Sequence, residues 1–164
     1  MTDHIVVGDH VPLDASFRAV RARLEILAMN GMLGWASEAA YGEGITYLVK
    51  AAGPAAGLTR LAEVHLDDLV ETDDSAHVAL QWVAIAADGK LFTALDAELI
   101  LAPAGDHYAA LAVAGTYRPP PGPASAELDQ AIMRRCAAMA IRGFLARVAC
   151  TLIHPAGTAG AYRS

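Results

Sequence analysis

Apolar residues recur at helical spacing near both ends of the chain and in a strand-like pattern between them. Ile5 to Val11 is short and β-branched, which predicts a first strand. From Asp14, which can cap a helix, apolar residues follow every three or four positions up to Asn30, and this spacing predicts an amphipathic helix. Met32 to Tyr41 predicts a short second helix that ends at the glycines following it.

The middle of the chain predicts a meander of antiparallel strands. No long helical period appears between Ile45 and Arg118, and turn residues recur at regular intervals. The breaks carry Gly-Pro, Asp-Asp-Ser, Asp-Gly and Pro-Ala-Gly, all of which favour turns. The predicted strands are Ile45 to Ala52, Leu61 to Leu69, His77 to Ala86, Leu91 to Leu101 and His107 to Tyr117.

Two of these turns predict a register that the side chains can check. A two-residue turn at Asp88-Gly89 and a short loop at Pro103 to Gly105 each fix which residues face one another. The register places apolar side chains on one face of the sheet. Asp96 and Glu98 fall on the opposite face, which we expect to meet solvent. The pairs on the first face are all apolar: Trp82–Leu95, Leu80–Ala97 and Val78–Leu99 in one hairpin, and Ala97–Leu111 and Leu95–Val113 in the next.

The longest helix is predicted after a proline-rich segment, Arg118 to Pro123, which cannot continue a sheet. Ser125 can cap this helix, acids follow in its first turn, and the helix runs to about Ile153. Its apolar stripe is predicted to face the sheet. Four arginines fall mostly off that stripe, and we interpret them as a solvated face: Arg134, Arg135, Arg142 and Arg147.

Composition fits one globular domain over residues 1–164. Hydrophobic residues make up 55% and charged residues 18%, so a large apolar interior is expected. The net charge of −6 does not favour nucleic-acid binding. No apolar run is long enough to predict stable insertion in a membrane. Strand, helix and meander together predict an α+β fold in which a curved antiparallel sheet of about six strands wraps around the C-terminal helix.

Cys136 and Cys150 lie fourteen positions apart in the predicted last helix, which separates them by about 21 Å. They cannot form a disulfide with each other, and we interpret both as small core residues. Free thiols fit a reducing compartment, and the N-terminus shows no signal-peptide pattern. We therefore expect a cytoplasmic protein.

This order of elements resembles the START-like superfamily (SRPBCC), which includes polyketide cyclase-like proteins. The resemblance implies a helix-grip fold with a hydrophobic cavity between the sheet and the last helix, although many members have seven strands. The superfamily shares no catalytic motif, so the resemblance implies a cavity and no mechanism. Some segments also look like those of uncharacterised bacterial members of this superfamily: Leu91-Phe92, Leu95 to Leu99, Gly115 to Pro120 and Leu128-Asp129.

No motif points to a particular chemistry, so the catalytic residues stay unknown. Asp96 and Glu98 are an acid/base pair in principle, but their place on the polar face favours a solvated role. The histidines and cysteines lack the spacing of a metal site, and we predict neither a metal nor a cofactor.

The candidate ligand-binding residues are large side chains expected to face inward among alanines and glycines that leave space. They are Trp82, Leu95, Leu99, Val113, Tyr117, Met139, Trp35 and Tyr47. The first hypothesis is that this pocket binds a small apolar molecule, such as a lipid or a polyketide-like aromatic compound. The alternatives are a cyclase or dehydratase acting in the same cavity, and a ligand-free interaction domain that forms a homodimer.

Overall fold

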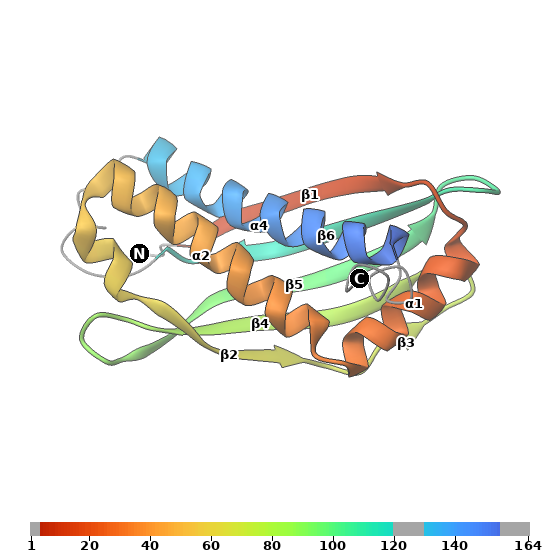
Figure 1. Cartoon of the computed structure of the whole chain (residues 1–164), viewed down its shortest axis with the longest axis horizontal. Coiled ribbons are helices and arrows are strands. Elements are labelled where there is room, and N and C mark those ends of the chain that lie inside the picture. Colours follow the sequence, from red (N-terminus) through yellow and green to blue (C-terminus); the bar gives the residue numbers. More distant parts are fainter. Residues whose placement is uncertain (1–3, 120–129, 155–164) are drawn as a thin grey trace, which may run out of the picture.

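The computed structural model describes residues 4–119 and 130–154 of the chain. Helices and strands follow the order expected from the sequence, with one long helix at the C-terminal side (Figure 1). The elements are β1 (Ile5–Leu13), α1 (Phe17–Met29), α2 (Met32–Ala52), the 3₁₀ turn η1 (Pro54–Leu58), β2 (Arg60–Leu66), β3 (Val70–Glu71), β4 (Ala76–Ile85), β5 (Leu91–Pro103), β6 (Ala109–Tyr117) and α4 (Gln130–Ile153).

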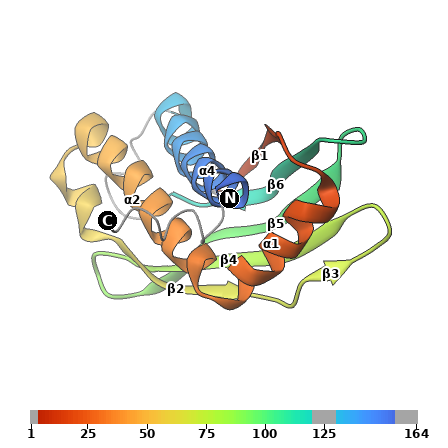
Figure 2. The same cartoon turned by 45° about the vertical axis from the view of Figure 1, so that its right-hand side comes forward.

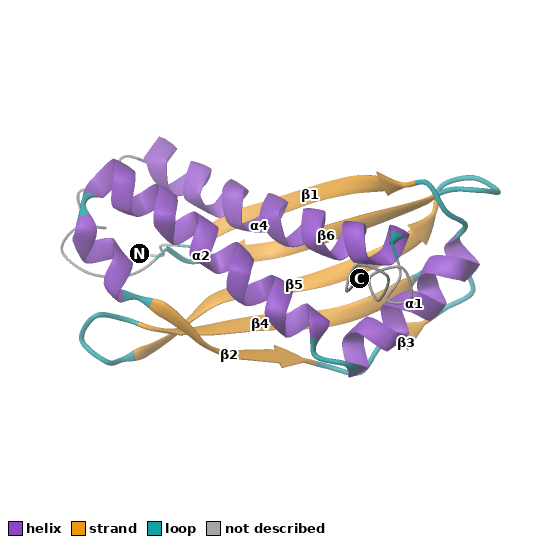
Figure 3. Cartoon of the chain, viewed as in Figure 1, coloured by secondary structure: helices purple, strands orange, loops and turns teal. Residues whose placement is uncertain are grey.

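The described strands form one six-stranded antiparallel sheet in the order β1-β6-β5-β4-β2, with the short β3 also paired to β4. The sheet is curved, and α2 and α4 lie side by side across its concave face (Figures 2 and 3). The predicted α+β, helix-grip architecture is therefore confirmed. The predicted cap at Ser125, with the first-turn acids after it, and the proline segment beyond Pro119 lie outside the described residues.

The strand predicted at Ile45 to Ala52 is wrong, because these residues continue α2. Its β-branched and aromatic residues favour a strand locally, but Ile45 and Leu48 follow Tyr41 at helical spacing and are buried with it. The helix ends only at Gly53, which has a positive φ of 107° and is followed by Pro54. The residues predicted as the first strand of the meander thus belong to a helix that lies over the sheet.

The first helix begins later than predicted. Its N-cap is Ser16 rather than Asp14, and the Ser16 hydroxyl accepts a hydrogen bond from the Ala19 N–H at 3.3 Å. The shift lengthens β1 to Leu13, which pairs with Ala109 of β6.

The predicted pairs between β4 and β5 are confirmed. The loop is one residue longer than predicted, and an extra residue in β5 compensates for it. The loop has three residues, since the Ala86 N–H bonds the Lys90 carbonyl at 2.8 Å, and Gly89 takes a positive φ of 86°. A β-bulge at Ala94 then adds one residue to β5, so Trp82 still faces Leu95.

The predicted register of β5 and β6 is wrong by four positions. The Ala104 N–H bonds the Tyr108 carbonyl at 2.9 Å, so β5 extends to Pro103 and β6 begins at Ala109 rather than His107. Leu95 consequently pairs with Tyr117, and Val113 pairs with Leu99. A shift of four leaves every side chain on its predicted face, because the strand period is two.

The helix α4 is, within the described residues, the one helix apolar and long enough to cross a membrane. Its side chains Ala137, Ile141, Phe144 and Val148 are buried against α2 and the sheet. It is the core helix of the fold rather than a membrane span.

The helices α2 and α4 approach closely at Gly44. A Cβ atom there would lie 3.2 Å from the Cys136 carbonyl oxygen and 3.4 Å from the Ala140 Cβ. Nearby, Arg147 of α4 donates a hydrogen bond to Glu43 of α2 at 2.5 Å, and this bond lowers the pKa of the Glu43 carboxyl. Because a Cβ atom at position 44 would press against α4, the glycine there allows the two helices to approach this closely.

Replacing Gly44 by Val should destabilise the protein by about 1–3 kcal/mol, because the added methyl groups overpack this contact. The matched control is Gly42→Val, where the structure leaves open space for a Cβ. Urea unfolding of the two variants measures the difference. Equal unfolding midpoints would contradict the close packing of α2 on α4.

Candidate functional site

Five of the eight predicted site residues come together in the interior. Trp82 faces Leu95 across the β4–β5 pair, Leu95 faces Tyr117 across the β5–β6 pair, and Leu99 faces Val113. All five side chains are buried. They lie on the concave face of the sheet, beneath α2 and α4.

The other three predicted residues lie elsewhere. Met139 is 39% exposed and Trp35 is 55% exposed, so the prediction that they line the interior is wrong. Tyr47 is half-buried at the margin of the core. The buried face of α4 is broader than the predicted stripe, because α4 packs on α2 as well as on the sheet. The predicted stripe residues Cys136 and Phe144 are buried, as are the flanking Met133, Ala140 and Val148, and the buried face further includes Ala137, Ile141, Leu145 and Leu152.

Trp82 sits at the centre of an aromatic cluster that the sequence only partly indicated. Its ring meets Tyr41 at a centroid distance of 6.1 Å, Tyr117 at 6.4 Å and Phe144 at 6.0 Å, each nearly edge-on. Tyr41 was missed because the second helix was predicted to end there. Its position above Trp82 depends on the continuation of α2, which local propensity did not show.

Polar atoms of this cluster are poorly paired. The Trp82 Nε1 atom is buried and has no hydrogen-bond partner among the described residues. The Tyr117 hydroxyl lies 4.0 Å from the Cys136 Sγ, and the Tyr41 hydroxyl lies 3.5 Å from the Thr59 Oγ1. An ordinary O–H···O bond measures about 2.7–2.8 Å, so the Tyr41 contact is weak, and the Tyr117 contact with sulfur is also long. The Cys136 thiol itself donates a hydrogen bond to the Gly44 carbonyl at 3.4 Å. Tyr41, Trp82, Tyr117 and Cys136 are named here the buried donor cluster.

The protonation states of this cluster make it a set of donors. Burial raises the pKa of Tyr41 to about 12 and the pKa of Cys136 to about 11. Burial also holds the pKa of Tyr117 well above its ordinary value. At neutral pH all three groups therefore carry their protons, and none is a base or an anionic nucleophile.

A groove between α2 and β2 reaches this cluster from outside. It has a volume of about 320 Å³ and includes Tyr41 and Thr59, the two residues whose hydroxyls meet. Ile45 and Leu61 make its walls apolar, while Glu38 and Arg60 are exposed. Tyr41 thus separates the groove from the Trp82 ring.

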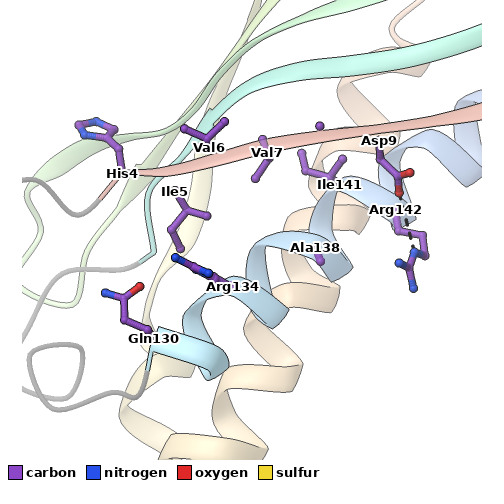
Figure 4. A pocket seen from close by; sticks show the side chains of 11 residues that line it. His4, Ile5, Val6, Val7, Asp9, Gln130, Arg134, Ala138, Ile141 and Arg142 are labelled. Atoms are coloured by element: carbon purple, nitrogen blue, oxygen red, sulfur yellow. Dashed lines mark ion pairs between the residues drawn. The ribbon is translucent and has the colours of Figure 1, made fainter.

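A larger groove, of about 560 Å³, lies between β1 and α4 (Figure 4). None of the eight predicted site residues lines it. It is named here the β1–α4 groove. Its lining residues are His4, Ile5, Val6, Val7, Gly8 and Asp9 from β1 and the residue before it, and Gln130, Arg134, Ala138, Ile141 and Arg142 from α4.

Among the described residues, no carboxylate or histidine side chain is buried in the interior. Asp96 and Glu98 are exposed on the opposite face of the sheet, as predicted, and Glu98 lies 3.3 Å from the ring of His77. No group of three His, Cys, Asp or Glu side chains among the described residues is placed to hold a metal ion.

The described fold has the order that the resemblance implies: strand, two helices, antiparallel meander and C-terminal helix in the concavity. This is the helix-grip arrangement that the resemblance implies. Solved structures that align with most of this chain include an aromatase/cyclase and a START superfamily protein, each with a TM-score below 0.5.

A conserved protein from Geobacillus kaustophilus has a TM-score of 0.49 at 11% identity, over 90% of this chain and 95% of that one. The Zhui aromatase/cyclase from Streptomyces sp. R1128 has a TM-score of 0.36 at 10% identity, over 94% and 98%. A START superfamily protein from Mycobacterium smegmatis has a TM-score of 0.28 at 14% identity, over 87% and 96%. No family model matches the chain, and no curated protein matches it. Likeness at this level does not transfer a ligand or an activity.

The two thiols should differ in reactivity. Cys136 is buried and its pKa is about 11, whereas Cys150 is exposed, which corrects its prediction as a core residue. A thiol reagent at pH 8 should label one cysteine per native chain, at position 150, and both after denaturation. Peptide mapping locates the label. Rapid native labelling of Cys136 would contradict the packing described here.

Proposed function

We propose that the chain binds a small, mostly apolar molecule that carries a hydrogen-bond acceptor such as a carbonyl oxygen. The acceptor sits at the buried donor cluster, between the sheet and the helices α2 and α4. The observation that supports this proposal most is the Trp82 indole N–H, which meets no acceptor in the part of the chain that the structure describes although the side chain is fully buried. Leaving a buried donor unpaired costs about 1–3 kcal/mol, which an acceptor from a ligand would recover.

The surroundings of the cluster favour an apolar body on the ligand. Leu95, Leu99, Val113 and Phe144 are buried around the aromatic rings. A charged group would lose its hydration among these side chains without gaining a counter-ion. The ligand class is therefore a neutral ketone, quinone or ester with an apolar or aromatic frame.

The groove between α2 and β2 supplies a route to the cluster. Tyr41 lines it and also contacts the Trp82 ring, so in this proposal a ligand displaces the Tyr41 side chain to pass from the groove to the interior. The weak bond from Tyr41 to Thr59, at 3.5 Å, leaves the hydroxyl ready for a better acceptor.

The donors of the cluster are protonated at neutral pH, and this favours a binding protein over the cyclase or dehydratase alternative. A cyclase of that kind needs a group that removes a proton from its substrate. Tyr41, Tyr117 and Cys136 stay protonated at neutral pH, and the carboxylates Asp96 and Glu98 lie on the opposite face. The cluster can orient and polarise a carbonyl group but supplies no base.

A matched ligand pair tests the proposal. In a Trp35→Phe background, Trp82 is the remaining tryptophan, and its emission reports on the interior. Fluorenone should produce a saturable change, and fluorene, which has the same ring frame without the carbonyl, should bind about tenfold more weakly. Equal affinities would show an apolar pocket without donor recognition. Absence of binding by both compounds would leave the ligand-free interaction domain as the better account.

A hydroxyl deletion separates binding from folding. Tyr41→Phe keeps the ring against Trp82, and its stability should change by less than about 1 kcal/mol because the lost bond is long. Its affinity for fluorenone should fall severalfold, while that for fluorene stays the same. Tyr108→Phe is the control, since Tyr108 is 52% exposed on the loop before β6. An unchanged preference for fluorenone in Tyr41→Phe would remove Tyr41 from the proposed site.

A further inference from the structure

We infer a second binding site, for a small anionic amphiphile, in the β1–α4 groove. The site is separate from the buried donor cluster and does not depend on the proposed function. The ligand is a single-chain carboxylate whose tail lies along the groove and whose head group meets Arg134.

Apolar side chains form the floor of the groove. Ile5 and Val7 point the same way from β1, and Ala138 and Ile141 face them from α4 (Figure 4). Val7 and Ile141 are buried, so the floor is continuous with the core. Ala138 is small and exposed, which leaves the space between the helix and the strand open. A linear or flat apolar tail fits such a floor.

Two arginines of α4, Arg134 and Arg142, line the groove beside this floor. The helix α4 carries four arginines and no acidic residue, in a chain whose net charge is −6. Arg147 is paired with Glu43, and Arg142 lies 3.9 Å from Asp9 with 76% of its side chain exposed. Arg134 makes no ion pair with any described residue, and Figure 4 shows it reaching from α4 toward Ile5. Its guanidinium is therefore the cation that an anionic head group would meet.

The size and charge of the groove favour one small molecule over a membrane surface. A volume of about 560 Å³ falls in the range of small-molecule sites. An anionic bilayer would be repelled by the net charge of −6 and would face Asp9 on the wall of the groove. A single carboxylate needs only Arg134, with Arg142 nearby as a weakly held second cation.

Calorimetric titration of the full chain with decanoate, below its aggregation concentration, tests this site. Decanoate should bind about tenfold more tightly than 1-decanol, which has the same tail without the charge, and acetate should not bind. The preference should shrink as salt is raised, since it rests on an exposed cation. Equal binding of decanoate and decanol, or no binding of decanoate, would overturn the inference.

Two neighbouring arginines provide a matched pair of variants. Arg134→Gln should weaken decanoate binding about tenfold and leave decanol unchanged, and Arg134→Lys should restore part of the loss. Arg135→Gln is the control, because Arg135 is exposed on the same helix and does not line the groove. Both positions are exposed, so neither change should affect folding. Equal losses in the Arg134→Gln and Arg135→Gln variants would show a general effect of charge and contradict the site.

Two further arms separate this site from other sources of binding. Tyr41→Phe should leave decanoate affinity unchanged, and saturating fluorenone should not displace decanoate. Displacement would place both molecules in one site and overturn the second site. Vesicles containing phosphatidylglycerol should not bind the chain, and vesicle binding that depends on Arg134, without binding of free decanoate, would assign the arginine to a membrane surface instead.

Discussion

The close approach of α2 and α4 over the concave face of the sheet determines how the interior is built. Gly44 lets the two helix backbones come together beside Cys136, and the Glu43–Arg147 pair joins them at the next turn. This contact holds Tyr41 and Phe144 against Trp82, which rises from β4 below them. If the helices lay farther apart, the aromatic rings would lose their edge-on contacts and water would reach the donors between them.

The same packing leaves polar atoms that the protein does not satisfy well. A core made only of aliphatic side chains would avoid the cost of burying the Trp82 N–H and the hydroxyls of Tyr41 and Tyr117. Their presence among leucines and valines is a departure from an optimal core, and such departures are typical of binding sites. The β1–α4 groove differs in character, since its arginines stay hydrated and its apolar floor is open.

The sequence predicted what short-range rules determine. Strand alternation identified which face of β4, β5 and β6 is buried, and it remained right even where the register was off by four residues. It failed at Ile45 to Ala52, where a segment rich in β-branched and aromatic residues is helical because α4 covers one of its faces. Trp82 and Tyr117 were therefore placed correctly on the buried face. The position of Tyr41 depends on how α2 packs over the sheet, and the grooves depend on how α4 packs beside β1 and α2 beside β2.

The indole N–H of Trp82 is the most direct reporter of the proposed binding site. In uniformly ¹⁵N-labelled Trp35→Phe protein, a single indole Nε1–H resonance remains, since the chain has two tryptophans. Saturating fluorenone should move this resonance downfield and slow its exchange with water, because the N–H gains a carbonyl acceptor. Fluorene should leave the chemical shift of the indole N–H proton nearly unchanged, because it offers no carbonyl acceptor. An indole resonance that stays in place at saturating fluorenone would contradict the account, since the buried donor would then take no part in binding.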